Sequence, residues 1–145
     1  MGFFFIGHLF YIITLQVLFK LSIKVWIVAL CVMLLSFFVL WFVETRLRFF
    51  KIDFGNVGDF VYIYNIVLSV VVGLALGLVI TMKAAPVALH LLGTVVLFYI
   101  SDFILIFKYF SPAKDKKIAK PLGFVNHLTY YAAQLGFALL PLFFI

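Results

Sequence analysis

The chain carries little charge for its length. Only 11% of its 145 residues are Asp, Glu, Lys or Arg, and acidic residues number five. A soluble globular domain has about 25% charged and about 45–50% apolar residues, whereas 68% of this chain is hydrophobic and its mean hydropathy is +1.32. A particle of this size cannot bury so much apolar surface in its own interior. A soluble domain is therefore excluded, and lipid must form part of the solvent.

Cysteine, histidine and the motifs of soluble hydrolases are also scarce. The single Cys31 excludes an internal disulfide, and we interpret it as a small core residue. The histidines at positions 8, 90 and 127 lack the spacing of a zinc site, and no H-E-x-x-H is present. No G-x-S-x-G elbow occurs, so Ser101 is a poor acyl nucleophile. We expect neither a metal nor a cofactor.

What the sequence contains instead is a set of long apolar runs. Each is long enough, at about 17–25 residues, to cross a bilayer as a helix. The runs cover residues 2–19, 25–43, 59–81, 87–107 and 123–144. The short alternating segments of a transmembrane barrel do not occur. We therefore predict an all-α membrane protein, with residues 1–145 forming a single integral-membrane domain that is a bundle of about five transmembrane helices.

The basic residues predict how this bundle is oriented. The connections 44–58 and 108–122 hold eight of the eleven Lys and Arg residues. The positive-inside rule then places these connections and the N-terminus in the cytoplasm. The membrane would be the plasma membrane, or the inner membrane if the chain is bacterial. The net charge of +6 is explained by topology and lipid headgroups, and no nucleic-acid motif is present.

Two glycines on the third run predict close helix packing. Gly73 and Gly77 form a GxxxG pattern, in which small residues let helix backbones approach each other. We expect the pattern to serve packing inside the bundle rather than dimerisation, while a homo-oligomer stays open as an alternative.

Polar side chains lie at a similar depth inside four of the runs. Asp102 lies five residues before Phe107, and His8 lies six residues after Gly2. At about 1.5 Å per residue these positions are about 8 and 9 Å from the cytoplasmic side. Intramembrane carboxylates usually face a bundle interior or a cavity, so we predict a functional site around Asp102 and His8.

Further polar residues accompany this pair. On the fifth run a stripe with helical spacing includes the residues His127, Tyr130, Tyr131 and Gln134. Tyr11 shares the face of His8, while the third run adds Tyr62, Tyr64 and Asn65. For Tyr62, Tyr99 and Tyr130 the alternative is an interface anchor. His90 lies near the other surface, and we interpret it as interfacial.

Three stretches resemble segments of one known family, and they occur in the family's order. They are the Ser-Asp stretch LGTVVLFYISDFILIFKYF, the His stretch FFFIGHLFYIITL and the terminal stretch LTYYAAQLGFALL, which together cover about a third of the chain. The ordered set is more specific than any of its members. The sequence thus resembles the YhhN family of lysoplasmalogenase-like membrane proteins. Family members are usually longer, with a Gly-Asp motif in a span before the His-containing one. We therefore expect a chain without those N-terminal spans, either a fragment or a short divergent member.

The resemblance implies hydrolysis of the vinyl-ether bond of a lysophospholipid, lysoplasmalogen, to a fatty aldehyde and a glycerophospho-headgroup. Vinyl ethers hydrolyse when carbon is protonated, so the hypothesis makes Asp102 the proton donor. His8 would position water or take its proton, although the two roles could be exchanged. The candidate substrate-binding residues are Tyr11, Tyr64, Ser101, Tyr130, Tyr131 and Gln134. For Ser101 the alternative is a hydrogen bond to its own helix.

Two other functions stay open at this stage. Intramembrane Asp and His residues also form proton relays, which favours a small transporter. Transporters often contain repeats and helices broken near the midplane, and neither feature is evident in this sequence. The other alternative is a non-catalytic assembly subunit whose polar groups satisfy one another. A polar pocket confined to one leaflet would favour the enzyme, and a continuous polar path would favour the transporter.

Overall fold

The protein is described by a computed structural model that covers residues 2–46, 54–110 and 116–145. These residues form the helices α1 (Gly2–Phe19), α2 (Ile23–Arg46), α3 (Gly58–Thr81), α4 (Pro86–Phe110) and α5 (Lys116–Leu139). A short 3₁₀-helix, η1 (Gly55–Val57), precedes α3, and a second, η2 (Leu140–Phe144), follows α5. No strand occurs in the described ranges. The predicted all-α bundle is therefore confirmed.

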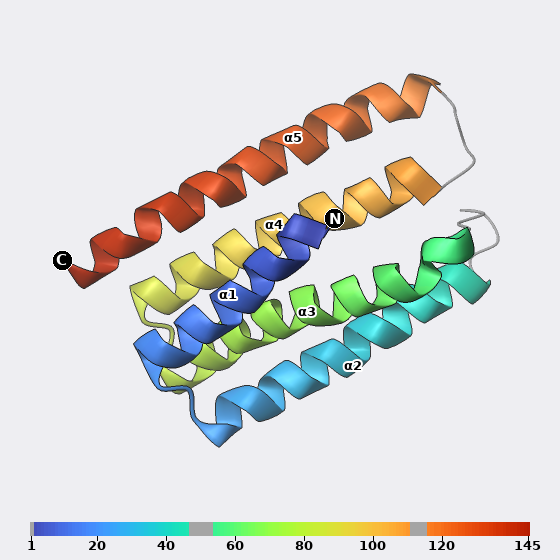
Figure 1. The fold of residues 1–145 in the computed structure, drawn as a ribbon. Coiled ribbons are helices and arrows are strands. Elements are labelled where there is room, and N and C mark those ends of the chain that lie inside the picture. The colour runs from blue at the N-terminus through green and yellow to red at the C-terminus, as the bar shows by residue number, and fades with distance from the viewer. Residues whose placement is uncertain (1, 47–53, 111–115) are drawn as a thin grey trace.

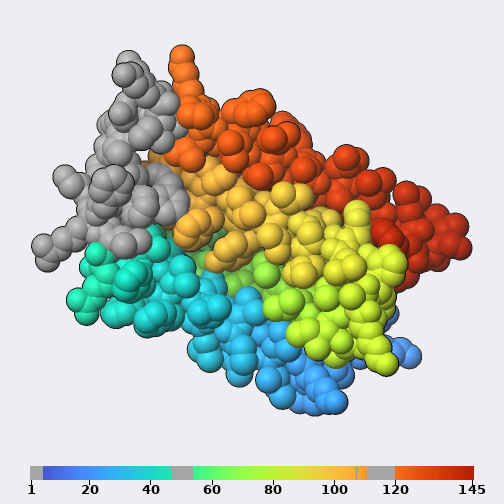
Figure 2. Space-filling view, turned by 180° about the vertical axis from the view of Figure 1, so that it is seen from behind, coloured from blue at the N-terminus to red at the C-terminus, as the bar shows by residue number. Residues whose placement is uncertain are grey.

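The helices form a row with one helix laid against it. Helices α2, α3, α4 and α5 lie side by side in chain order, and each runs opposite to the one before it (Figure 1). Helix α1 packs on one face of the row, mainly against α3. The opposite face is covered by α2, α4 and α5, which leave little of α3 visible between them (Figure 2). Helix α3 is thus the centre of the bundle, with neighbours on three sides.

Three of the helices are long and apolar enough to cross a membrane. These segments are Ile23–Arg46, Gly55–Thr81 and Pro86–Phe110. The apolar part of α1, Phe5–Phe19, is shorter. The chain is therefore an integral membrane protein, whereas the crossing of the bilayer by α1 and α5 stays a prediction. Orientation stays a prediction as well. Of the basic residues used for it, Arg48, Lys51 and Lys114 lie outside the described residues.

The last helix differs in its bounds from the run at 123–144. Helix α5 already begins at Lys116 and ends at Leu139, where the 3₁₀-helix η2 takes over. Pro141 lies in the first turn of η2. Proline has no N–H to continue an α-helical ladder, so the helix ends just before it.

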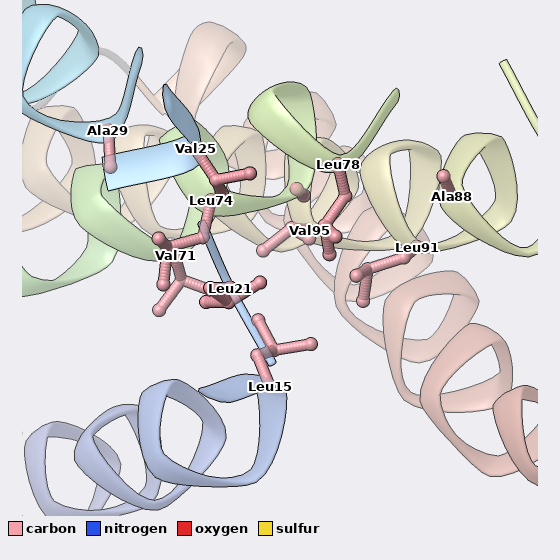
Figure 3. Close-up of a cluster of buried hydrophobic side chains, with 11 residues drawn as sticks. Leu15, Leu21, Val25, Ala29, Val71, Leu74, Leu78, Ala88, Leu91 and Val95 are labelled. Atoms are coloured by element: carbon pink, nitrogen blue, oxygen red, sulfur yellow. The ribbon is translucent and has the colours of Figure 1, made fainter. Parts of the chain in front are cut away.

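An apolar core fills the half of the bundle that contains the α1–α2 and α3–α4 connections. Side chains from four helices and from the first of these connections converge there (Figure 3). The buried members are Leu15, Leu21, Val25, Ala29, Val71, Leu74, Ala75, Leu78, Ala88, Leu91 and Val95. Burial of these side chains gives dense packing and dispersion contacts, which hold membrane helices together where no water is displaced.

The two glycines of the GxxxG pattern bring α3 against α2. A Cβ atom added at Gly73 would lie 2.5 Å from the Cα of Ala29, and one added at Gly77 would lie 2.9 Å from the Cα of Val25. Both distances are far shorter than a real carbon–carbon contact. Only glycine therefore allows this approach, and the pattern serves packing inside the bundle, as the sequence analysis expected.

The interpretation of Cys31 as a core residue is wrong. Cys31 is exposed, because α2 buries only the face that meets α3. The buried residues of α2 are Val25, Ala29, Ser36, Leu40 and Val43, a stripe with helical spacing that Cys31 does not share. The rest of the helix surface is apolar and exposed, as expected of a helix that lies in lipid.

We predict that Gly73→Val lowers the stability of the bundle by about 1–3 kcal/mol, the usual cost of overpacking a well-packed core. The added side chain would meet the backbone of Ala29, so α2 and α3 must separate. Thermal unfolding in detergent would measure the loss. Gly93→Val is the matched control, because a Cβ at Gly93 meets nothing within 4 Å. Equal losses in the two variants would contradict the packing role.

Candidate functional site

Tyr64 on α3 lies between the two residues that the sequence analysis placed at the centre of the site. Its hydroxyl donates a hydrogen bond to Oδ2 of Asp102 on α4. Its ring lies edge-on to the ring of His8 on α1, with the centroids 5.9 Å apart. His8 is 2% exposed and Asp102 is 9% exposed. The structure therefore brings Asp102 and His8 into one buried cluster, in which Tyr64 contacts both.

Aromatic rings enclose His8. The ring of Phe98 lies 4.9 Å from it and the ring of Tyr11 lies 6.0 Å from it, centroid to centroid. Tyr11 in turn stacks on Phe137 of α5, with the centroids 4.5 Å apart and the planes 11° from parallel. Edge-to-face and stacked arrangements of this kind are the favoured geometries of aromatic pairs. They fix the orientation of the imidazole and link α1 to α4 and α5.

A second group of polar side chains lies beside Asp102, and we call it the polar ring. It consists of Ser36 on α2, Asn65 on α3 and Tyr99 on α4. The amide nitrogen of Asn65 donates to Ser36 Oγ at 3.0 Å, and the Tyr99 hydroxyl donates to Asn65 Oδ1 at 3.1 Å. The hydroxyl oxygens of Ser36 and Tyr99 lie 2.6 Å apart. Each member is thus bonded to the other two across three helices.

A small cavity connects the polar ring with the Asp102 cluster. The surface that borders it is apolar, although polar residues are among those that surround it: Tyr64, Asn65, Leu68, Tyr99, Asp102, Phe103 and Ile106. Its volume is about 10 Å³. On this measure one water molecule needs about 10–15 Å³ and two to four polar partners. The cavity offers no polar surface to a water molecule, and it is far too small for a lipid chain.

Ser101 does not face this cavity. It is fully buried between α4 and α5, where its Oγ donates to the backbone oxygen of Asn126 at 3.3 Å. The side-chain nitrogen of Asn126 donates back to the oxygen and the Oγ of Ser101, at 2.8 and 2.9 Å. The alternative of a hydrogen bond to its own helix is therefore wrong, since a neighbouring helix supplies the partner, whereas substrate binding by Ser101 stays a prediction.

The predicted polar stripe on α5 divides between two faces. Tyr131 is 65% exposed, and His127 is also exposed with its Nδ1 bonded to the Gly123 carbonyl of its own helix. Tyr130 is half-buried, with its ring 5.9 Å from that of Phe98, and Gln134 is half-buried. The buried positions of α5 are instead Asn126, Ala133 and Gly136. Of the stripe, Tyr130 thus contacts Phe98, whose ring in turn contacts His8.

Two further polar residues tie helices together away from the site. His90 lies between α4 and α5, where its Nε2 donates to the Gly136 carbonyl at 2.8 Å. The Tyr62 hydroxyl donates to the Glu44 carboxylate and so links α3 to α2.

The sequence analysis did not single out Ser36 or Asn126. The available signal was weak, a lone polar residue inside an apolar run that must find a partner on another helix.

No metal centre is evident within the described part of the chain. There, no group of three His, Cys, Asp or Glu side chains gathers closely enough to hold an ion. The site residues include a carboxyl group, an imidazole and phenols, which can bind and release protons, and an amide, which donates and accepts hydrogen bonds.

Comparison with known proteins gives one match. The model of the YhhN family matches residues 1–140, which is nearly the whole chain. Searches of curated proteins and of solved structures found no match.

We predict that Asn126→Leu destabilises the bundle by about 1 kcal/mol, because interhelical hydrogen bonds in membranes contribute about 0.6 and at most about 1.7 kcal/mol. The substitution removes both bonds that the Asn126 side chain donates to Ser101. Unfolding in detergent would measure the change. Thr129→Val is the matched control, since the Thr129 hydroxyl bonds only carbonyls of its own helix, those of residues 125 and 126. An unchanged Asn126→Leu variant would contradict a stabilising role.

Proposed function

The chain belongs to the YhhN family, and we propose that it is a membrane-embedded hydrolase that cleaves the vinyl-ether bond of lysoplasmalogen-type lysophospholipids. The products would be a fatty aldehyde and a glycerophospho-headgroup. One observation carries the proposal: a carboxyl group and an imidazole from different helices, Asp102 and His8, are buried around one tyrosine, Tyr64. A buried acid beside a second proton-transfer group is what protonation of a carbon–carbon double bond requires.

The proposed reaction begins with proton transfer to carbon. Asp102 donates its proton to the vinyl carbon that does not bear the oxygen, and the other carbon becomes part of an oxocarbenium ion. Water adds to that carbon and loses a proton, either to the Asp102 carboxylate or to His8. The resulting hemiacetal collapses, with its hydroxyl proton passing to the glycerol oxygen as the old carbon–oxygen bond breaks. One water is consumed, and the acid returns to its starting state.

The distribution of polar groups favours an enzyme over a transporter. The Asp102 cluster and the polar ring occupy one half of the bundle, and the other half holds the apolar core. The buried hydroxyls found there, those of Ser69 and Thr94, bond carbonyls of their own helices at 2.8 Å. They do not extend the polar cluster into a path through the bundle. A polar site confined to one half supports chemistry on a lipid that enters from one leaflet.

The size of the cavity and the nearby charges are consistent with such a substrate. Because the volume of the cavity is only about 10 Å³, the alkenyl chain would lie against the outer surface of the helices and reach Asp102 from the bilayer. Arg46, Lys108 and Lys120 are exposed near the same end of the bundle. In this proposal that end faces the cytoplasm, and its positive charge attracts the phosphate of the lysophospholipid.

We predict that Asp102→Asn abolishes most aldehyde release from lysoplasmalogen, by about 10²–10⁴-fold, because the amide cannot donate an acidic proton to carbon. Purified chain in detergent or in vesicles would be supplied with the lipid, and the aldehyde would be measured. Asp59→Asn is the control, since Asp59 is an exposed carboxylate in the first turn of α3. Aldehyde release at the wild-type rate from Asp102→Asn would rule out the proposed acid.

We also predict that His8→Ala slows aldehyde release by at least about 10²-fold, the lower end of the contribution of a positioned proton-transfer group. His127→Ala is the matched control, because His127 is exposed and bonded to its own helix. The comparison uses the same lipid and the same assay. Similar rates in the two variants would contradict a catalytic role for His8 and would favour a role in packing.

A further inference from the structure

The hydroxyl group of Tyr64 is committed to Asp102. The Tyr64 side chain is 7% exposed, and its hydroxyl donates to Oδ2 of Asp102. In the opposite arrangement a protonated Oδ2 would donate to the phenol. The phenol proton would then lack an acceptor, because within the described ranges the hydroxyl has no other partner. A buried donor without an acceptor costs free energy, so Tyr64 is the donor in this bond.

This hydrogen bond determines which oxygen of Asp102 carries the acid proton. The carbonyl oxygen of a carboxylic acid accepts hydrogen bonds better than its hydroxyl oxygen, so Oδ2 is the carbonyl oxygen and the proton resides on Oδ1. In the described part of the chain nothing bonds Oδ1, whereas every completely buried side-chain oxygen there has a partner. Oδ1 is therefore not completely buried. The oxygen that bears the proton is the one that another molecule can reach.

The phenol ring of Tyr64 is itself held in place. It lies edge-on to the ring of His8, with the centroids 5.9 Å apart, and it packs in one core cluster with Leu68, Phe98 and Ala133. Helix α3, which carries Tyr64, contacts α1, α2 and α4. A donor held in this way needs no reorganisation when charge develops on the group that it bonds.

From these observations we propose that Tyr64 is a positioning residue for the acid Asp102. Its hydroxyl holds the carboxyl group with the proton on Oδ1 and stabilises the carboxylate that forms when this proton leaves. The inference rests on the proposed function and deepens it, because it names the residue that controls the acid. It also gives Tyr64 a role different from the substrate binding that the sequence predicted.

The assignment gives a balanced step. The proton on Oδ1 moves to the vinyl carbon that does not bear the oxygen, and the π electrons of the double bond form the new carbon–hydrogen bond. The electrons of the broken O–H bond stay on the carboxylate, where Oδ1 and Oδ2 share the charge. The bond from Tyr64 thereby becomes charge-assisted, roughly twice as strong as a neutral one. An interaction that is stronger in the transition state than in the ground state accelerates the reaction.

The experiment compares Tyr64→Phe with the wild type, using the full chain and lysoplasmalogen. The substitution removes the hydroxyl and keeps the ring that contacts His8. We expect kcat to fall about 10²–10³-fold, the effect of removing one donor to a developing charge. The KM should change little, because the hydroxyl bonds Asp102 and not the lipid.

Tyr62→Phe is the matched control. Tyr62 lies on the same helix, and its hydroxyl also donates to a carboxylate on a neighbouring helix, that of Glu44. The control therefore removes the same kind of interhelical bond without touching Asp102. It should keep the wild-type kcat and KM.

Infrared difference spectroscopy in mildly acidic buffer measures the bond without an activity assay. The C=O stretching band of protonated Asp102 is identified by its loss in Asp102→Asn, and few bands overlap it because the chain has only five acidic residues. A hydrogen bond to a carbonyl oxygen lowers its stretching frequency. Tyr64→Phe should therefore move the band to higher frequency, while Tyr62→Phe should leave it in place. If Tyr64→Phe does not accumulate, 3-fluorotyrosine at position 64, a stronger donor, should move the band to lower frequency.

The outcomes separate the positioning role from the proposed function. Tyr64→Phe with the wild-type kcat, or with an unmoved Asp102 band, would overturn the positioning role. A raised KM at an unchanged kcat would overturn it as well, in favour of substrate binding. Equal losses of kcat in Tyr64→Phe and Tyr62→Phe would also overturn it, in favour of a role in packing alone. A wild-type chain that releases no aldehyde would instead overturn the proposed function.

Discussion

The hydrogen bond from Tyr64 to Asp102 shows the constraint on which the arrangement of this bundle depends. In lipid a polar side chain has no water to bond, so each such group must find its partner on another helix or on its own backbone. Tyr64 and Asp102 bond each other between α3 and α4. The polar ring joins α2, α3 and α4, and Ser101 and Asn126 join α4 and α5. No buried side-chain nitrogen or oxygen lacks a partner in the described ranges. These bonds select which helix faces meet.

The apolar half of the bundle supplies what the polar bonds cannot, the close packing that keeps the helices at a fixed distance. Gly73 and Gly77 let the backbone of α3 touch α2, and Leu74 and Ala75 between them are completely buried. Tyr64 and Asn65 lie on the same helix, about two turns nearer its beginning. Their side chains are therefore carried by the most enclosed helix of the bundle. Precise placement of polar groups requires such a rigid support.

The sequence predicted the elements well because their lengths follow from the thickness of a bilayer. The positions of the helices along the chain, the packing role of Gly73 and Gly77, and the interior location of Asp102 and His8 could all be derived from it. What could not be derived is the rotation of each helix about its axis. In water the apolar face of a helix turns inward. In lipid both faces are apolar, so hydropathy does not tell them apart.

The residues whose helix face could not be predicted share this cause. Cys31 and Tyr131 lie on outward faces, and Ser101 faces α5 rather than the cavity beside its neighbour Asp102. Consecutive helix residues point about 100° apart, so an error in rotation separates even adjacent side chains. Only the partners on other helices fix the rotation, and they become visible in the structure. Ser36 was missed for the same reason, and the bonds that join it to Asn65 and Tyr99 could not be predicted because the three residues are far apart in sequence.

A site with one buried carboxyl group can complete the proposed cycle only if that group both gives and recovers the proton. Asp102 is placed for this because Tyr64 occupies Oδ2 and leaves Oδ1 as the atom for proton exchange. In our proposal the water that attacks the cation can return a proton to this carboxyl group. A second acid is not needed for hydration, and His8 can serve the leaving glycerol oxygen.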